Sequence, residues 1–225
     1  MNSDLTILAI LRRAETLFAT REIVTRRQDR GYHRYSYAEL GRRVRRLTSA
    51  LQRLGLGRGA RIATLSWSNH QHLELYYAPA AGFVTHPINP RLHADDIAYI
   101  VNQAEDDVLV VDDSLLALYE QVRDKIAPKH VVVIGHERAG LMDYEALVAG
   151  GDPEAPLPDL DEADSALVTF TSGTTGRPKG VEVSHRAIAI HALSSALGNF
   201  LAIRDSDVVM PVVPMFHALT AEYWP

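Results

Sequence analysis

The sequence predicts an α/β fold with mostly parallel sheets flanked by helices. Short β-branched apolar runs, such as residues 108–111 and 131–134, are typical of buried strands. Segments with helical spacing, such as residues 94–104, separate these runs. The chain has 225 residues, 47% of them hydrophobic and 23% charged, which is enough to bury a sizeable core. Strands that alternate with helices of this length predict parallel βαβ units with helices on both faces.

The N-terminal region predicts a helix, a hairpin and a second helix. Residues 5–18 have helical spacing, and two short strands at 22–25 and 33–37 flank a turn at 28–31. Ser36 followed by Glu39 is a capping-box pattern. We therefore expect a helix that continues through Leu54 and is closed by Gly55.

This second helix carries five arginines. A basic face of this kind would suit nucleic acid or coenzyme phosphates, but a solvated helix surface is the favoured interpretation. The arginines are Arg42, Arg43, Arg45, Arg46 and Arg53.

The middle of the chain alternates regularly. We expect strands at 61–65, 82–85, 108–111 and 131–134, and helices at 69–81, 94–104 and 114–126. Three acidic pairs lie near helix starts or strand ends, where capping and dipole roles are favoured over paired-carboxylate catalysis. They are Asp95/Asp96, Asp106/Asp107 and Asp112/Asp113.

Residues 150–164 are rich in Pro, Gly and acidic residues and resemble a linker. We therefore expect a first α/β subdomain at 1–150, a linker-like segment at 151–164 and the start of a second α/β subdomain at 165–225. Within the last part, a helix is expected at 184–201, with a strand at 208–213 after it.

A loop rich in glycine and hydroxyl groups follows the expected strand at 166–170. Glycines let the backbone turn tightly or approach a ligand, hydroxyls donate to phosphate oxygens, and one lysine adds positive charge. A flexible linker is the disfavoured alternative. The loop is neither a Walker-type phosphate loop nor Gly-x-Gly-x-x-Gly. Its key residues are Thr171, Ser172, Gly173, Thr174, Thr175, Gly176, Lys179 and Gly180.

His217 comes just after the expected strand at 208–213. In an open parallel sheet, residues past the carboxyl end of a strand line the ligand crevice, which makes His217 a site candidate. On these residues alone, a surface histidine or a hydrogen-bonded core histidine remains the favoured alternative. The other nine histidines show no spacing typical of metal ligands.

Composition argues against several classes of partner and chemistry. The net charge is −5, which gives no reason to expect nucleic acid as a partner, and the chain has no cysteine for disulfides or thiolate chemistry. It has no secretory signal pattern and no apolar stretch long enough to be a transmembrane segment. We expect a soluble protein in the cytoplasm.

Several segments resemble one family. The phosphate-binding signature of the adenylate-forming enzymes, the AMP-dependent synthetase and ligase family, is similar to TFTSGTTGRPKGVEVSH. The second signature of acyl-CoA synthetases resembles VVPMFHA. Medium- and long-chain fatty-acyl members are similar to ATLSWSNHQHLELYYA, THPINPRLHADDIAYIVNQAEDDVLVVD and KHVVVIG. The fold implied is the N-terminal part of the large domain of an adenylate-forming enzyme.

The resemblance implies a fatty acid–CoA ligase. Such enzymes join a fatty acid to ATP with Mg²⁺ to give an acyl-adenylate, and coenzyme A then displaces AMP. By resemblance, Thr171 is a magnesium ligand, His217 is a catalytic residue at the acyl and nucleotide site, and Ala218 contacts the nucleotide through its backbone. The implied ligands of the β- and γ-phosphates are Ser172, Gly173, Thr174, Thr175, Gly176 and Lys179. A homodimer is compatible with the resemblance.

Two departures from the family pattern matter. Long-chain members often place a tryptophan that gates the acyl tunnel where this chain has Ala221, which leaves the acyl chain length open. Members of the family are also more than twice as long and carry a C-terminal domain with an adenylation lysine. We expect residues 1–225 alone to be inactive, with uncovered sheet edges and apolar surface. The alternative is a non-enzymatic remnant that binds nucleotide weakly, and a kinase is disfavoured.

Overall fold

A computed structural model describes residues 4–171, 177–199 and 201–217. Within these residues one seven-stranded sheet has the order β7-β6-β5-β3-β4-β8-β9, and a two-stranded sheet pairs β1 with β2. All neighbours in the large sheet are parallel except β8 and β9, which confirms the expected fold class. The strands are β1 (Glu22–Arg26), β2 (Tyr32–Ser36), β3 (Arg61–Leu65), β4 (Val84–Pro87), β5 (Val108–Asp112), β6 (His130–Ile134), β7 (Met142–Asp143), β8 (Ser165–Thr171) and β9 (Lys179–Ser184).

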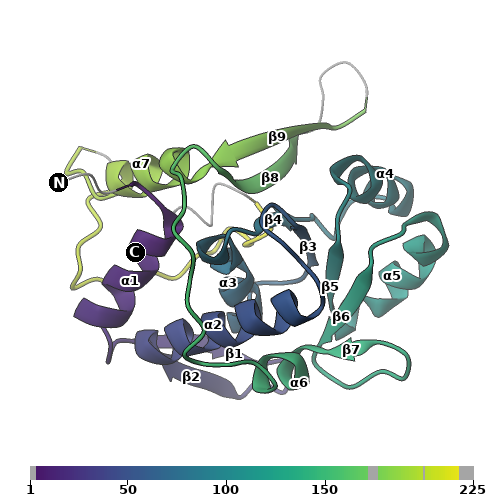
Figure 1. Cartoon of the computed structure of the whole chain (residues 1–225), viewed down its shortest axis with the longest axis horizontal. Helices are drawn as coiled ribbons and strands as arrows, with labels where there is room; N and C mark the ends of the chain where they lie inside the picture. Colours follow the sequence, from purple (N-terminus) through teal and green to yellow (C-terminus); the bar gives the residue numbers. More distant parts are fainter. Residues whose placement is uncertain (1–3, 172–176, 200, 218–225) are drawn as a thin grey trace.

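Helices cover both faces of the large sheet. Figure 1 shows α4 and α5 on one side and α2, α3 and α6 on the other. The alternation of β5 explains why two cores form: Val108 and Val110 pack on the side of α2 and α6, while Leu109 and Val111 pack on the side of α4 and α5. The helices are α1 (Ile7–Leu17), α2 (Tyr37–Arg53), α3 (His70–Tyr76), α4 (Ala94–Ala104), α5 (Leu116–Val122), α6 (Tyr144–Ala149) and α7 (His185–Ser195).

Most expected elements occur where the sequence placed them. The helix at 94–104 is confirmed at both ends, and the strands at 61–65, 108–111 and 131–134 are confirmed to within one residue. The capping box is also present in part, because the Ser36 hydroxyl accepts a hydrogen bond from the Glu39 N–H at 3.2 Å.

Two expected helices are broken. The helix at 69–81 divides into α3 and a 3₁₀ turn (Ala78–Ala81) that contains Pro79, which has no N–H to continue the α-helical ladder. Gly82 then adopts φ 83°, and β4 begins at Val84 rather than at residue 82. The helix at 114–126 is likewise α5 between two short 3₁₀ turns.

The expected strand at 208–213 is wrong. The structure describes this segment without regular secondary structure, and most of its side chains are exposed. A strand is held by ladder hydrogen bonds to a neighbour, and no described strand pairs with these residues. The β-branched composition therefore predicted a strand, but the described part of the chain has no neighbouring strand to pair with it. The expected helix at 184–201 is also shorter, because α7 ends at Ser195.

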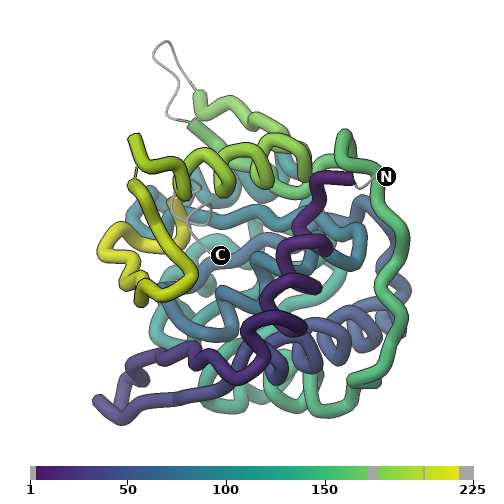
Figure 2. Tube along the Cα trace, turned by 90° about the vertical axis from the view of Figure 1, so that its left-hand side faces the viewer, coloured from purple at the N-terminus to yellow at the C-terminus, as the bar shows by residue number. Residues whose placement is uncertain are grey.

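Residues 150–164 run as an extended stretch from α6 to β8 (Figure 2). Ala155 and Leu160 are buried, so the stretch packs on the body of the molecule. The strands on its two sides share one sheet, joined where Thr85 of β4 pairs with Leu167 of β8. The expected division into two subdomains stays a prediction.

The arginines of α2 bind neighbouring parts of the chain. Arg45 forms two hydrogen bonds of 2.6 Å with Glu15 of α1, and Arg43 contacts Glu74 and Glu145. Arg46 and Arg53 donate to the carbonyls of Ala149 and Gly150, and Arg42 pairs with Glu39. The favoured interpretation, a solvated face, is therefore incomplete, because all of these side chains except Arg42 join α2 to its neighbours.

Among the described residues, no helix has the length and apolar character needed to cross a bilayer.

Candidate functional site

The two ends of the predicted phosphate loop meet in the β8–β9 ladder. Thr171 is the last residue of β8, Lys179 is the first residue of β9, and the two are directly opposite each other. Opposed residues in an antiparallel pair point to the same face, so the two side chains leave the ladder next to each other at the base of the loop. Both residues are exposed. The predicted ligands Ser172, Gly173, Thr174, Thr175 and Gly176 lie outside the described residues.

The other face of the β8–β9 ladder, which carries Phe170, packs against the interior of the molecule. Phe170 is paired with Gly180, and a Cβ atom on Gly180 would lie 3.1 Å from the Phe170 Cζ atom. Gly180 therefore makes room for an aromatic ring. The Phe170 ring also lies 5.1 Å from the ring of His86, whose Nδ1 is 2.8 Å from Asp106 Oδ2 in the interior. The base of the loop thus rests on the partly buried Phe170 ring, which packs against the buried His86–Asp106 pair.

Arg177, near the C-terminal end of the loop, contacts α4. Its guanidinium carbon lies 5.1 Å from the centroid of the Tyr99 ring, which is a cation–π geometry. This contact directs the chain toward α4 just before Lys179 enters β9. This contact could not be predicted from the sequence, because the two residues are far apart in the chain and meet only in the folded structure.

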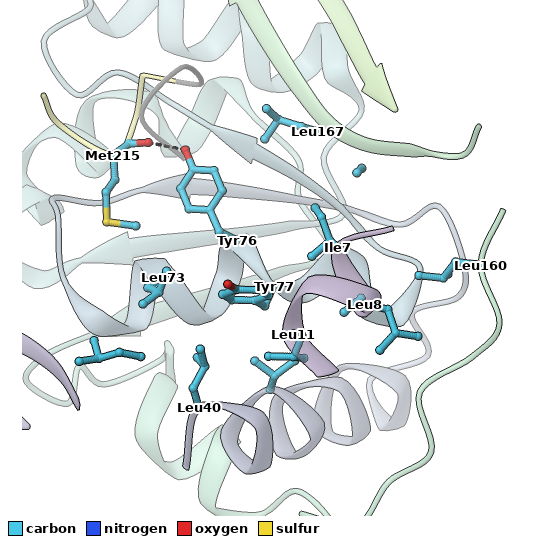
Figure 3. Close-up of a cluster of buried hydrophobic side chains, with 14 of the residues drawn as sticks. Ile7, Leu8, Leu11, Leu40, Leu73, Tyr76, Tyr77, Leu160, Leu167 and Met215 are labelled. Atoms are coloured by element: carbon cyan, nitrogen blue, oxygen red, sulfur yellow. Dashed lines mark hydrogen bonds between the residues drawn. The ribbon is translucent and has the colours of Figure 1, made fainter. Parts of the chain in front are cut away.

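His217 ends a short segment that is anchored on the body of the molecule. The Met215 N–H donates to Ser68 Oγ at 3.1 Å, and the Tyr76 hydroxyl donates to the Met215 carbonyl (Figure 3). The His217 N–H donates to the Pro214 carbonyl at 3.0 Å. His217 itself is exposed, and the structure does not describe Ala218.

An aromatic neighbour supports the His217 ring. The rings of His217 and Phe216 have centroids 5.0 Å apart, and the Phe216 and Trp67 rings form an edge-to-face pair with centroids 6.3 Å apart. The Arg91 guanidinium lies 5.8 Å from the Phe216 centroid. Trp67 follows β3 and Arg91 follows β4, so loops after two parallel strands hold this segment.

These groups share one edge of the sheet. The carboxyl ends of parallel strands lie at the same edge, which is where open α/β sheets bind ligands. Thr171 ends β8, which runs parallel to β4. Leu167 and Thr171 point to the same face by alternation, and Leu167 packs in the same cluster as Met215. The base of the loop and the segment that carries His217 therefore lie on the same side of the sheet.

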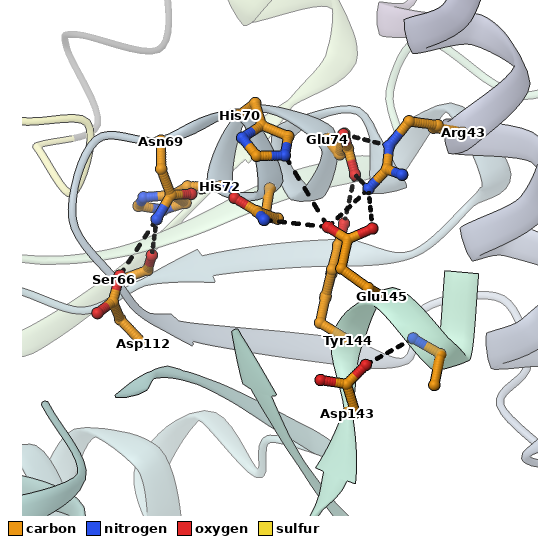
Figure 4. Close-up of polar contacts among 12 residues, drawn as sticks. Arg43, Ser66, Asn69, His70, His72, Glu74, Asp112, Asp143, Tyr144 and Glu145 are labelled. Atoms are coloured by element: carbon orange, nitrogen blue, oxygen red, sulfur yellow. Dashed lines mark hydrogen bonds and ion pairs between the residues drawn. The ribbon is translucent and has the colours of Figure 1, made fainter. Parts of the chain in front are cut away.

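A buried polar cluster lies beneath this edge (Figure 4). The Glu74 carboxylate is fully buried; it accepts two hydrogen bonds from Arg43, at 2.7 and 3.1 Å, and one from the Tyr144 hydroxyl at 2.9 Å. Burial raises the pKa of Glu74, and Arg43 opposes this shift. Arg43 also reaches Glu145. The cluster joins α2, α3 and α6, and the sequence did not predict it because these residues are far apart in the chain.

Histidines extend the cluster toward the β1–β2 hairpin. The rings of His33 and His70 are stacked with centroids 3.9 Å apart. Burial, followed by the charges of His33 and Arg43, lowers the pKa of His70 to about 3. Burial also lowers the pKa of His72 to about 4, although its hydrogen bond to the Trp67 carbonyl opposes this. Both rings are therefore neutral at neutral pH.

Comparison with known proteins identifies the family. The family model described as AMP-binding enzyme matches residues 11–225. The chain belongs to the AMP-binding enzyme family. This AMP-binding family chain is 43% identical over 221 residues to the long-chain-fatty-acid–CoA ligase of Thermus thermophilus, an alignment that covers 96% of this chain and 40% of the relative. It is 38% identical over 226 residues to the medium-chain-fatty-acid–CoA ligase of Ectopseudomonas oleovorans, with 96% and 41% covered.

A solved structure shows the same fold. The long-chain-fatty-acid-CoA ligase from Archaeoglobus fulgidus superposes with a TM-score of 0.87 at 22% identity, covering 99% of this chain and 45% of that one. The chain therefore spans about 40% of the length of the curated relatives it matches. The resemblance to the adenylate-forming family and the fold class are both confirmed.

Proposed function

We propose that this AMP-binding family chain supplies the nucleotide-binding edge of a fatty acid–CoA ligase. The reaction would join a fatty acid to ATP, giving an acyl-adenylate and pyrophosphate, and then transfer the acyl group to coenzyme A with release of AMP. The observation that carries this proposal is the opposition of Thr171 and Lys179 at the base of the loop. The similarity to fatty acid–CoA ligases supports the choice of substrates.

Charge explains what the loop would do. The α-phosphorus of ATP is surrounded by negative oxygens, and the departing pyrophosphate gains negative charge as the bond breaks. Positive charge and N–H donors that are already in place stabilise that change. In this proposal Lys179 supplies the charge, and the loop residues supply donors to the β- and γ-phosphates. They are Ser172, Gly173, Thr174, Thr175 and Gly176.

The side chains fit a magnesium ion that arrives with ATP. Thr171 offers one neutral hydroxyl, and the described residues contain no group of three or more His, Cys, Asp or Glu placed to hold a metal. Magnesium is commonly bound through few protein ligands together with substrate phosphates. Thr171 would therefore complete the coordination of an ion held mainly by the triphosphate, and the ion would offset charge on the leaving group.

His217 would lie where the acid meets the nucleotide. Phe216 and Trp67 give it an aromatic support, and Ala218 would contact the nucleotide through its backbone. The proposal assigns no acyl chain length, because Ala221, at the gate position, lies outside the described residues. ATP and coenzyme A are cytoplasmic substrates, so we place the proposed reaction in the cytoplasm.

Lysine removal tests the ATP site. Lys179→Gln should weaken binding of MgATP by about 10- to 100-fold, because a hydrogen bond to a charged group contributes about 1.5–3 kcal/mol. Lys129→Gln is the matched control. Lys129 comes just before β6, at the amino ends of the parallel strands and therefore away from the proposed site, and it pairs with Asp107. Titration calorimetry on the 225-residue chain measures both. Equal affinities for the two variants would contradict the proposed site.

Pyrophosphate release separates the enzyme from a non-enzymatic remnant. We expect residues 1–225 alone to release no pyrophosphate with ATP and a fatty acid, because the chain spans about 40% of its relatives. Release that depends on fatty acid once the remaining part of the fold is supplied supports the ligase. Nucleotide binding without release in that same preparation supports the remnant.

A further inference from the structure

The outer end of β8 separates from β4 before the chain reaches the phosphate loop. The ladder between the two strands consists of one pair, Thr85 with Leu167. The N–H of Ile88 donates to β3, so by alternation the neighbouring position 87 faces β8. That residue is Pro87, which has no N–H to continue the ladder. Residues 168–171 therefore pair with β9 alone.

Side chains must set the direction of this two-stranded ribbon, which consists of residues 168–171 and 179–182. Two strands without further support are only marginally stable. Figure 1 shows α4 near the outer end of the ribbon, and α4 contacts β9. Three contacts join the ribbon and the end of the loop to α4, β3 and β4: Arg177 with Tyr99, Glu182 with Arg61, and Phe170 with His86.

Only the last of these three contacts reaches the interior. Arg177 and Glu182 are exposed, and exposed charged side chains contribute little to holding a segment in place. Phe170 is half-buried and packs against the core on the side of α4, with its ring centroid 5.1 Å from that of the buried His86. The contact between these two rings is therefore the main support of the ribbon.

A buried hydrogen bond fixes the orientation of the His86 ring. Its Nδ1 lies 2.8 Å from Asp106 Oδ2, and the two side chains are 1% and 0% exposed. Among the described residues, His86 Nε2 and Asp106 Oδ1 have no hydrogen-bond partner. An apolar pair of this size would stabilise the fold as well or better. The hydrogen bond adds orientation instead, because the ring can turn only by breaking it.

We propose that His86 is a positioning residue for the phosphate loop and acts through Phe170. Phe170 comes directly before Thr171 in β8. Gly180, which faces the Phe170 ring, comes directly after Lys179. A displacement of the ring therefore moves both ends of the loop together. This inference rests on the proposed ATP site, and it assigns no contact between His86 and the nucleotide.

Two variants remove the ring contact while the interior stays satisfied. His86→Asn removes one ring, and the new amide can still donate to Asp106, so the carboxylate keeps a partner. Phe170→Leu removes the other ring and stays apolar. Val132→Ala is the control for a general loss of stability, because Val132 is fully buried in β6 on the other face of the sheet. Hydrogen exchange with mass spectrometry and titration calorimetry are measured on the 225-residue chain.

Hydrogen exchange tests the support of the ribbon without nucleotide. In His86→Asn and Phe170→Leu we expect amides at residues 179–183 to exchange about tenfold faster, relative to those of Val108–Asp112 in β5, than in the unaltered chain. Val132→Ala should leave this ratio unchanged. An unchanged ratio in both ring variants overturns the inference, since the ribbon would then not depend on the contact between the rings.

Titration with MgATP tests the positioning role. Each ring variant should weaken binding about tenfold, and the double variant should bind no more weakly than either, because both changes break the same contact. Val132→Ala should bind as the unaltered chain does. In the Lys179→Gln background, His86→Asn should have a smaller effect, because part of what it positions is gone. A merely structural role would give the full effect in both backgrounds and overturn the inference.

The same titrations separate this inference from the proposed function. If Lys179→Gln weakens MgATP binding and His86→Asn does not, this inference alone is wrong. If Lys179→Gln has no effect by itself, the proposed ATP site is wrong, and the positioning role of His86 falls with it.

Discussion

Gly151 determines how closely the extended stretch before β8 can approach α2. A Cβ atom at this position would lie 2.0 Å from the carbonyl oxygen of Arg46, a separation that real atoms do not adopt. The Arg53 side chain donates to the neighbouring Gly150 carbonyl in the same contact. The absence of a side chain therefore allows the stretch to be held by main-chain groups and arginines.

Gly151→Ala should lower the free energy of unfolding by about 1–3 kcal/mol, because backbone atoms must move to admit the methyl group. Gly57→Ala is the matched control, since no other atom lies within 4 Å of the corresponding Cβ position. Urea denaturation of both variants measures the difference. An equal effect of the two substitutions would show that the stretch does not pack as described.

At the scale of the element, Asn69 joins α3 to two strands of the sheet. Its side-chain oxygen accepts a hydrogen bond from the His72 N–H at 2.8 Å and so caps the helix. Its amide nitrogen donates to Ser66 and to Asp112, each at 3.2 Å. One residue thus fixes the start of α3 against the carboxyl ends of β3 and β5.

Asn69→Ala should lower the free energy of unfolding by about 2 kcal/mol, because the cap and two partly buried bonds are lost together. Ser36→Ala removes a single capping bond from α2 and should cost about 1 kcal/mol. Thermal and urea unfolding of the two variants make the comparison. A Ser36 variant as unstable as the Asn69 variant would mean that the bonds to Ser66 and Asp112 contribute nothing.

The sequence predicted elements better than it predicted contacts. Strands such as β3 and β5 could be recognised because their β-branched runs are buried on both sides of a parallel sheet. The segment at 208–213 has the same composition and failed, since a strand also needs a neighbour that local sequence does not reveal. The break at Pro79 was readable in principle, because proline cannot donate to a helix ladder.

The candidate site was predicted through motifs. Thr171 and Lys179 could be singled out from their residue types and from their positions next to expected strands. His217 was singled out by an expected strand that the structure does not have and by the resemblance of VVPMFHA to a family signature. Their supports could not, because Phe216 meets Trp67 and Arg91 only after distant loops are brought to one edge. The position of Trp67 and Arg91 just past two strands was the one available signal. The assigned roles of the site residues remain predictions.

At the scale of the whole molecule, the buried polar cluster couples folding to pH. The pKa of His70 is lowered to about 3 and that of His72 to about 4, from an ordinary value of 6.5. At pH values between each lowered pKa and 6.5, the unfolded chain binds more protons than the folded chain. Stability therefore falls as the pH drops below about 6.5. The raised pKa of Glu74 acts in the opposite sense, and comparison of variants at one pH cancels its contribution.

His70→Phe keeps a ring against His33 and removes one buried titrating group. Between pH 4 and 6 we expect the slope of unfolding free energy against pH to decrease by about 1 kcal/mol per unit. His93→Phe, which removes an exposed histidine, is the control. Urea denaturation at several pH values tests this, and an unchanged slope in the His70 variant would show that this ring is not buried as neutral imidazole.

The placement of Trp67, Arg91 and Phe216 in loops beyond the strand ends has an evolutionary consequence. The buried clusters that stabilise the sheet lie below those loops. A loop can therefore change in length or chemistry with little effect on the free energy of unfolding. Relatives that are 38–43% identical to this chain over the aligned region are named long-chain-fatty-acid–CoA ligase, medium-chain-fatty-acid–CoA ligase and 3-methylmercaptopropionyl-CoA ligase. Loops at this edge can therefore differ in length or chemistry while the two cores beneath them keep the same packing.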